Sequence, residues 1–164
     1  MKKKKIILIA SIIIVLCAII LIFIMQNIKK VRYSSFEDLL LKNDFKIINQ
    51  YDSGEVITVG EGNSYVINNK TVDYLKDEIN VSIVEMKNNE EVKEELEVYY
   101  SFYNDGNNIQ KNEEKKYVSI KLVSEIEYKY LIGVDNILIY INIYGKNLND
   151  DIYNMLIDYI KYNY

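Results

Sequence analysis

The sequence has no histidine and only one cysteine among its 164 residues. Without histidine, neither a Ser–His–Asp or Cys–His catalytic set nor a histidine-containing metal site can form. A single cysteine excludes an internal disulfide and a four-cysteine zinc site. Histidine is also the side chain whose unperturbed pKa lies near neutral pH, so we do not expect a simple pH switch. We expect no cofactor.

Acidic residues are missing from the first 32 positions, which hold seven of the twenty basic residues. From residue 33 onward, thirteen basic residues stand against twenty-four acidic ones, a net charge of −11. Such an acidic body repels phosphate backbones, which argues against nucleic acid as a partner. The same charge favours a soluble, monomeric domain and discourages contact with anionic lipid.

A run of twenty uncharged residues occupies positions 6–25, and Ser11 is its one clearly polar member. At a helical rise of about 1.5 Å per residue the run would extend roughly 30 Å, the thickness of a bilayer's hydrocarbon core. A cleaved signal peptide usually has a shorter apolar region that ends at a small-residue cleavage site. No Ala-x-Ala pattern follows this run. We therefore predict an uncleaved transmembrane helix at residues 6–25, with the lipid bilayer as its partner.

The basic residues around this run predict its orientation. Four lysines at positions 2–5 precede it, and Lys29, Lys30 and Arg32 follow it. The positive-inside rule then places the N-terminus in the cytoplasm. The expected organisation is a basic cytoplasmic tail at 1–5, a single-pass helix at 6–25, a juxtamembrane linker at 26–33 and an extracytoplasmic domain at 34–164.

Cys17 lies inside the apolar run, directly after Leu16. A bacterial lipoprotein signal has a small residue at the position before its cysteine. An unmodified, membrane-buried cysteine is therefore favoured over a lipidated one.

Three helices are expected in the domain. Ser34 and Ser35 predict the start of a short helix that ends near Asp44, and Asn89 is the expected cap of a longer helix over residues 88–103. The apolar stripe of that longer helix comprises Val92, Leu96, Tyr99 and Tyr103. A last helix is expected after Asn149.

Strands are predicted at residues 46–52, 55–60, 64–68, 81–86, 117–124, 126–132 and 137–144. Strict alternation in the last three predicts an antiparallel meander with a hairpin turn at residues 133–136. Residues 71–80 are ambiguous, with a weak preference for a short helix. The expected fold class is α+β, an antiparallel sheet with helices packed on one face.

The other sheet face is expected to meet water, and it is the candidate partner-binding surface. Its predicted members are Lys121, Glu127, Lys129, Tyr140, Asn142 and Tyr144. Exposed tyrosines beside charges and an amide are typical of recognition surfaces. The alternative is that tyrosine, present sixteen times, is simply frequent here and pairs well across strands.

Two acid-rich segments could supply metal ligands. Asp105, Asn107, Glu113 and Glu114 carry calcium-type oxygens without the spacing of an EF-hand loop. The acids after Asn149 fit the first turn of a helix, where capping and the helix dipole account for them. We therefore expect no metal site.

Three function classes remain open. A membrane-anchored, non-catalytic domain that binds another cell-envelope protein or a surface ligand is favoured. The first alternative is a carboxylate-based hydrolase of the cell envelope, for which Glu125 and Glu127 are the nearest pair. The second is an accessory subunit of a membrane complex, although the apolar run has no Gly-x-x-x-Gly pattern for helix packing.

The order of features resembles that of the single-span membrane-anchored small α+β proteins and lipoproteins of low-GC Gram-positive bacteria. The resembling features are the lysines at positions 2–5, the isoleucine-rich run, the turn and strand at residues 133–144, and the helix after Asn149. The chain departs from the lipoprotein pattern at Leu16. The resemblance implies a cell-surface location and transfers no catalytic or binding residue.

Overall fold

The computed structural model describes residues 16, 32–59, 63–66, 68–104, 108–145 and 148–164. Val31–Tyr164 forms one compact unit, and Met1–Lys30 is assigned to another. In the part of the chain that is described, no helix combines the length and the apolar character needed to cross a membrane. The helix predicted at residues 6–25 lies outside the described residues apart from Leu16, and Cys17 lies outside them as well.

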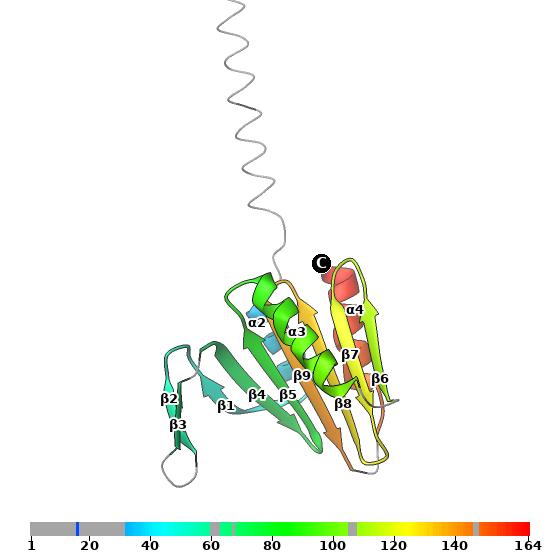
Figure 1. Ribbon diagram of the computed structural model, residues 1–164, viewed down its shortest axis with the longest axis horizontal. Coiled ribbons are helices and arrows are strands. Elements are labelled where there is room, and N and C mark those ends of the chain that lie inside the picture. The colour runs from blue at the N-terminus through cyan, green and yellow to red at the C-terminus, as the bar shows by residue number, and fades with distance from the viewer. Residues whose placement is uncertain (1–15, 17–31, 60–62, 67, 105–107, 146–147) are drawn as a thin grey trace, which may run out of the picture. The chain divides into compact units, whose positions relative to one another are not determined.

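Figure 1 shows a twisted sheet with helices on both sides. The elements are α2 (Tyr33–Lys42), β1 (Lys46–Tyr51), β2 (Val56–Val59), β3 (Asn63–Val66), β4 (Lys70–Lys76), β5 (Ile79–Glu85), α3 (Asn89–Tyr103), β6 (Ile109–Glu113), β7 (Val118–Val123), β8 (Glu127–Val134), β9 (Ile137–Tyr144) and α4 (Asp151–Asn163). Seven strands form an antiparallel sheet in the order β1-β4-β5-β9-β8-β7-β6, and β2 and β3 form a separate hairpin.

The centre of the sheet is β9, whose residues are predicted correctly from their alternation. Its odd-numbered isoleucines, from Ile137 to Ile143, are all buried. β9 pairs with β5 on one side and β8 on the other, and β8 pairs with β7. The predicted meander of the last three strands is therefore confirmed.

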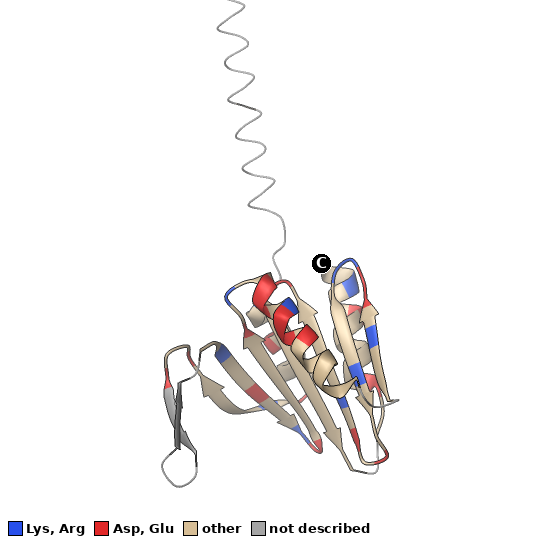
Figure 2. Ribbon diagram, in the orientation of Figure 1, with Lys and Arg blue, Asp and Glu red and all other residues tan. Residues whose placement is uncertain are grey.

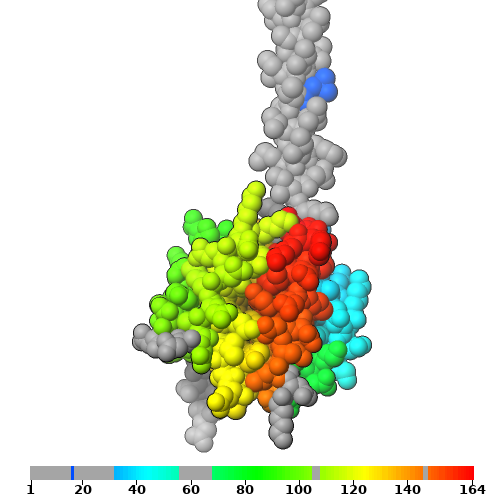
Figure 3. All heavy atoms as spheres, turned by 90° about the vertical axis from the view of Figure 1, so that its right-hand side faces the viewer, coloured from blue at the N-terminus to red at the C-terminus, as the bar shows by residue number. Residues whose placement is uncertain are grey.

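One face of the sheet is covered by α2 and α4, which carry their own apolar stripes. Phe36 and Leu40 of α2, and Leu156 and Ile160 of α4, are fully buried. The two helices also contact each other, since the rings of Phe36 and Tyr159 lie 5.7 Å apart. Figure 3 shows α4 packed between α2 and the strands β6 and β7. This face holds the larger of the two hydrophobic clusters.

Among the described elements, α3 is the one that covers the opposite face (Figure 1). Val92 and Leu96 of α3 pack on Ile120, Leu131 and Leu138, which are buried beneath it. Gly133 of β8 allows this close approach, because a Cβ there would lie 2.6 Å from Leu96 Cδ1 and 2.7 Å from Val92 Cγ1. The prediction of helices on one face only is therefore wrong. The physical reason is that Leu131 and Leu138 also lie on the face expected to meet water, and α3 shields them from it.

Two segments of the chain differ from their predictions. Residues 71–80 belong to β4, the following turn and β5, not to a helix, and Asp77 at that turn has a φ of 53°. Strand β6 was not predicted. It pairs with β7 at the edge of the sheet, and only Ile109 in it is apolar.

The helix starts are displaced by one or two residues from their predicted caps. Asn88 rather than Asn89 caps α3, since its Oδ1 accepts a hydrogen bond of 2.9 Å from the Glu91 amide. Helix α2 begins at Tyr33, before Ser34 and Ser35, and has no side-chain cap. Gly133, expected in a turn, is the penultimate residue of β8, and the turn falls at Asp135 and Asn136.

Candidate functional site

Five of the six residues predicted for the open sheet face share one side of the sheet. Glu127 of β8 is the cross-strand partner of Tyr144 in β9, and Lys129 is the partner of Asn142. Partners in an antiparallel pair point to the same face. Tyr140 follows the same alternation, and this is the face on which α3 packs.

Lys121, the sixth predicted residue, lies on the opposite face. Its cross-strand partner is Tyr130, and its ammonium lies 2.5 Å from a carboxylate oxygen of Asp150 at the start of α4. The Tyr130 hydroxyl donates to the same carboxylate. The prediction for Lys121 is wrong because the β7–β8 register pairs it with a core tyrosine and not with Lys129.

The Lys121–Asp150 ion pair joins the start of α4 to strand β7. Burial acts to raise the pKa of the Asp150 carboxyl, but hydrogen bonds from Lys121 and Tyr130 and the Lys121 charge outweigh it. The pKa of Asp150 therefore lies below its ordinary value of 3.8. The ring of Tyr130 stacks on Tyr153 of α4 at 4.6 Å between centroids, and the Tyr153 hydroxyl lies 2.9 Å from Ser119 Oγ. This cluster has a structural role.

Tyr140 is covered by α3 and is not free for a partner. Its hydroxyl donates a 3.1 Å hydrogen bond to Oε1 of Glu95. Burial, followed by the charge and hydrogen bond of Glu95, raises the pKa of Tyr140. Tyr140 therefore belongs to the contact between α3 and the sheet.

An ion pair remains accessible at the end of the sheet beyond this contact. Lys129 Nζ lies 3.1 Å from Glu127 Oε2, and both side chains are partly exposed. Burial acts to lower the pKa of Lys129, but Glu127, and to a lesser degree Tyr103 and Tyr144, raise it above its ordinary value. Both tyrosines therefore lie near the ammonium.

The C-terminal end of α3 supplies aromatic rings that the sequence pattern did not single out. Phe102 is 75% exposed, and its ring lies 5.0 Å from that of Tyr103. Phe102 falls outside the apolar stripe that faces the core. Its position beside that stripe is the feature of the sequence from which its exposure could be predicted. We define the α3–β9 surface as Phe102, Tyr103, Glu127, Lys129, Asn142 and Tyr144.

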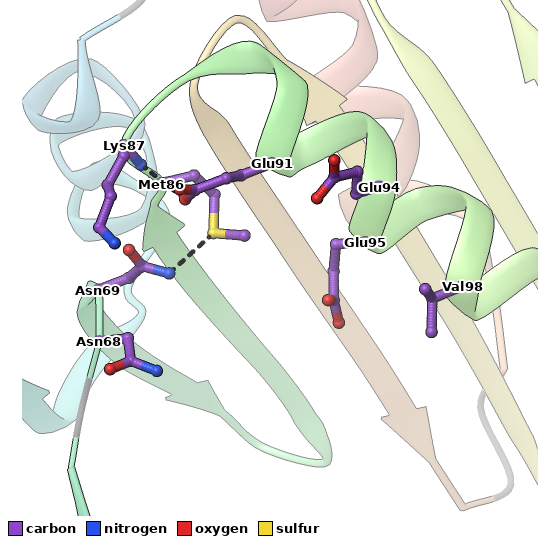
Figure 4. A pocket seen from close by; sticks show the side chains of 8 residues that line it. All are labelled: Asn68, Asn69, Met86, Lys87, Glu91, Glu94, Glu95 and Val98. Carbon is purple, nitrogen blue, oxygen red and sulfur yellow. Dashed lines mark hydrogen bonds between the residues drawn. The ribbon is translucent and has the colours of Figure 1, made fainter.

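A pocket of about 430 Å³ lies along α3 on the side of β4 and β5 (Figure 4). It is lined by Asn68, Asn69, Met86, Lys87, Glu91, Glu94, Glu95 and Val98. Asn69 Nδ2 lies 3.2 Å from the sulfur of Met86 and helps to form the wall opposite α3. Three carboxylates and one ammonium among the lining residues give it a net charge of −2.

The described residues do not bring together a catalytic or metal-binding set. Within them, no group of three or more carboxylate or cysteine side chains is placed to hold a metal ion. Glu125 lies exposed in the turn before β8, while Glu127 pairs with Lys129. Ser119 is buried against Tyr153, so it forms no Ser–Lys pair with Lys121.

No protein-family model, no curated protein and no solved structure matches this chain.

Proposed function

We propose that this chain is a membrane-anchored, non-catalytic binding domain. Residues 6–25 hold it in the bilayer, and residues 34–164 face the exterior and bind another cell-envelope protein. The observation that carries the proposal is the α3–β9 surface, which combines the exposed rings of Phe102 and Tyr144 with a partly exposed ion pair. The basic tail and the uncharged run of twenty residues support the anchor.

The composition of the α3–β9 surface supports protein recognition. Phe102 is 75% and Tyr144 is 48% exposed, and both lie near the Glu127–Lys129 pair or its neighbour Tyr103. Aromatic side chains supply large contact areas at little cost in conformational entropy, which is why they are frequent at the energetic centres of interfaces. Isolated exposed apolar residues are common on protein surfaces, but this group combines apolar area with groups that fix orientation.

Protease treatment of intact cells tests the location. We expect external protease to remove the domain of residues 34–164 without lysis. A domain that survives until the cells are lysed would overturn the proposed orientation.

Hydroxyl-radical footprinting of the unmodified chain tests binding. Tyr162 of α4, 87% exposed, is the internal reference on the far face of the sheet. We expect Tyr144 to be oxidised more slowly, relative to Tyr162, in intact cells than in the purified full chain. An unchanged ratio would contradict binding through the α3–β9 surface.

A further inference from the structure

One side of α3 carries a stripe that lines the pocket in its N-terminal half and is exposed in its C-terminal half. Glu91, Glu95, Val98 and Phe102 recur at intervals of four, three and four residues, which places them on one side of a helix. They lie beside the stripe of Val92 and Leu96 that packs on the sheet. We call these four residues the α3 flank.

The α3 flank is divided into an acidic half and an apolar half. Glu91 and Glu95 stand in its N-terminal half, and the exposed Glu94 adjoins them. Val98 and Phe102 form the C-terminal half, and their side chains are 62% and 75% exposed. At about 1.5 Å per residue, the two halves are roughly 10 Å apart along the helix.

The pocket runs along the acidic half of the flank. Figure 4 shows Glu91, Glu95 and Val98 projecting from α3, with Asn68 and Asn69 across from them. The Tyr140 hydroxyl donates to Glu95, and the Lys87 amide donates to Glu91 at 3.2 Å. Two of the carboxylates are therefore held in place by the domain, beside an apolar patch.

We propose that the α3 flank and its pocket bind a basic amphipathic segment of a partner protein. Lysine or arginine side chains of that segment enter the acidic half, and its apolar side chains cover Val98 and Phe102. The inference rests on the proposed function, of which it names the partner's chemistry. Charge complementarity carries it, because the pocket has a net charge of −2 and the chain from residue 33 onward has a net charge of −11.

The same charges disfavour other occupants. Anionic lipid and nucleic acid would be repelled by Glu91, Glu94 and Glu95. An acidic peptide would meet the same repulsion. A purely apolar segment would displace water from the charged carboxylates of the pocket and supply no opposite charge in its place.

The test uses the full chain in nanodiscs of zwitterionic lipid and a labelled amphipathic helical peptide of leucine and lysine. Glu94→Lys reverses a charge in the pocket, and Phe102→Ala removes the exposed ring. Asp158→Lys and Tyr162→Ala make matched changes at exposed positions of α4. Empty nanodiscs measure binding of the peptide to lipid alone.

We expect Glu94→Lys to weaken peptide binding about three- to tenfold, since one charge pair is lost and a repulsion replaces it. Phe102→Ala should weaken it about tenfold. The two α4 variants should bind the peptide as tightly as the unchanged chain does. Added salt should weaken peptide binding to a similar degree in the unchanged chain, Phe102→Ala and the two α4 variants, and to a different degree in Glu94→Lys.

Equal binding by all four variants would overturn the inference, as would equal binding of a peptide with glutamate in place of lysine. If the peptide fails to bind while Tyr144 remains protected from oxidation in cells, the inference about the partner's chemistry is wrong and the proposed function stands. If the peptide binds at the flank while Tyr144 is not protected, the chemistry is supported and the proposed cellular role is contradicted.

Discussion

The two faces of the sheet share the same strands and differ in how they are covered. On one face, α2 and α4 bury a continuous cluster, and Lys121, Asp150 and Tyr130 close the contact with hydrogen bonds. On the other, α3 alone covers a smaller cluster. Near the C-terminal end of α3, the Glu127–Lys129 ion pair is partly exposed and the ring of Phe102 is exposed.

We expect the face under α2 and α4 to determine stability, and the face under α3 to determine binding. The face under α2 and α4 holds most of the buried apolar side chains, and burial of apolar surface is the main favourable term in folding. The face under α3 needs only enough burial to hold that helix. Figure 2 shows that acidic residues gather on the first turns of α3, whereas few mark the strands beneath it. The α3 side is thus the one where surface changes are expected to alter binding more than folding.

The largest effect is expected from removing core side chains on the α2–α4 face. Leu156→Ala leaves a cavity beneath a fully buried position, and we expect it to lower the free energy of unfolding by about 2–5 kcal/mol. Leu96→Ala makes the same chemical change under α3, next to the open side, where neighbours can relax into the space. Denaturation of the full chain compares them. A larger loss for Leu96→Ala than for Leu156→Ala would contradict the expectation that the α2–α4 face contributes more to stability.

The next effect concerns the approach of α3 to β8. Gly133→Ala places a Cβ within 2.7 Å of Val92 and Leu96 side-chain atoms, and we expect a loss of about 1–3 kcal/mol from overpacking. Hydrogen exchange should quicken in α3 and not in α4. Combining Gly133→Ala with Leu96→Ala should cost less than the sum of the two single changes. If the two losses in stability simply add, the close contact between residue 133 and Leu96 does not cause the loss in Gly133→Ala.

A smaller effect is expected at Asp150. Asp150→Asn should cost about 1–2 kcal/mol at neutral pH, because the hydrogen bonds from Lys121 and Tyr130 lose their charged acceptor. The folded-state pKa of Asp150 is depressed, so its stabilisation is present above its ordinary value of 3.8 and is lost as pH falls through the lower folded value.

Urea denaturation over a pH series checks this sign. The gap in stability between the unchanged chain and Asp150→Asn should be widest near neutral pH and should narrow in acid. Tyr130→Phe removes the tyrosine hydrogen bond to Asp150 and keeps the Lys121–Asp150 pair. In this background the stability gap on replacing Asp150 should still narrow in acid, but by a smaller amount. A gap that grows in acid would mean that the carboxylate does not stabilise α4 in the way described.

The smallest effect on stability is expected at the α3 flank. Phe102→Ala should change the free energy of unfolding by less than about 0.5 kcal/mol, as should Tyr162→Ala, because both rings are largely exposed. Thermal unfolding of the two variants measures this directly. A loss above 1 kcal/mol for Phe102→Ala alone would place Phe102 in the folding core rather than on a binding surface.

The elements with strong local patterns are predictable from the sequence. Strand β9 follows from its alternating isoleucines, and α3 is placed within one residue by its cap and its stripe of Val92 and Leu96. Strand β4 is harder to predict, because only Val72 and Tyr74 are buried in it and Lys76 takes the next position on their side, so the alternation is too short to indicate a strand. Strand β6 pairs only at an edge and needs few apolar residues, so it leaves little periodicity to detect.

The candidate site depends on tertiary features that local patterns do not contain. The face that Lys121 occupies is set by the register between β7 and β8. Whether Tyr140 is open depends on the path of α3 across the sheet, which is fixed by the contact at Gly133. Glu127, Lys129, Asn142 and Tyr144 were grouped correctly because they lie on adjacent strands whose alternation is regular.

Site-specific photocrosslinking in intact cells can show which side of the sheet contacts a partner. A photoreactive phenylalanine analogue replaces Phe102 in one full-length chain and Tyr162, the exposed ring of α4, in another. We expect a discrete crosslinked protein from position 102, lost when Glu94→Lys is added, and none from position 162. Identical products from both positions, or a product from position 162 alone, would contradict the assignment of binding to the α3 side of the sheet.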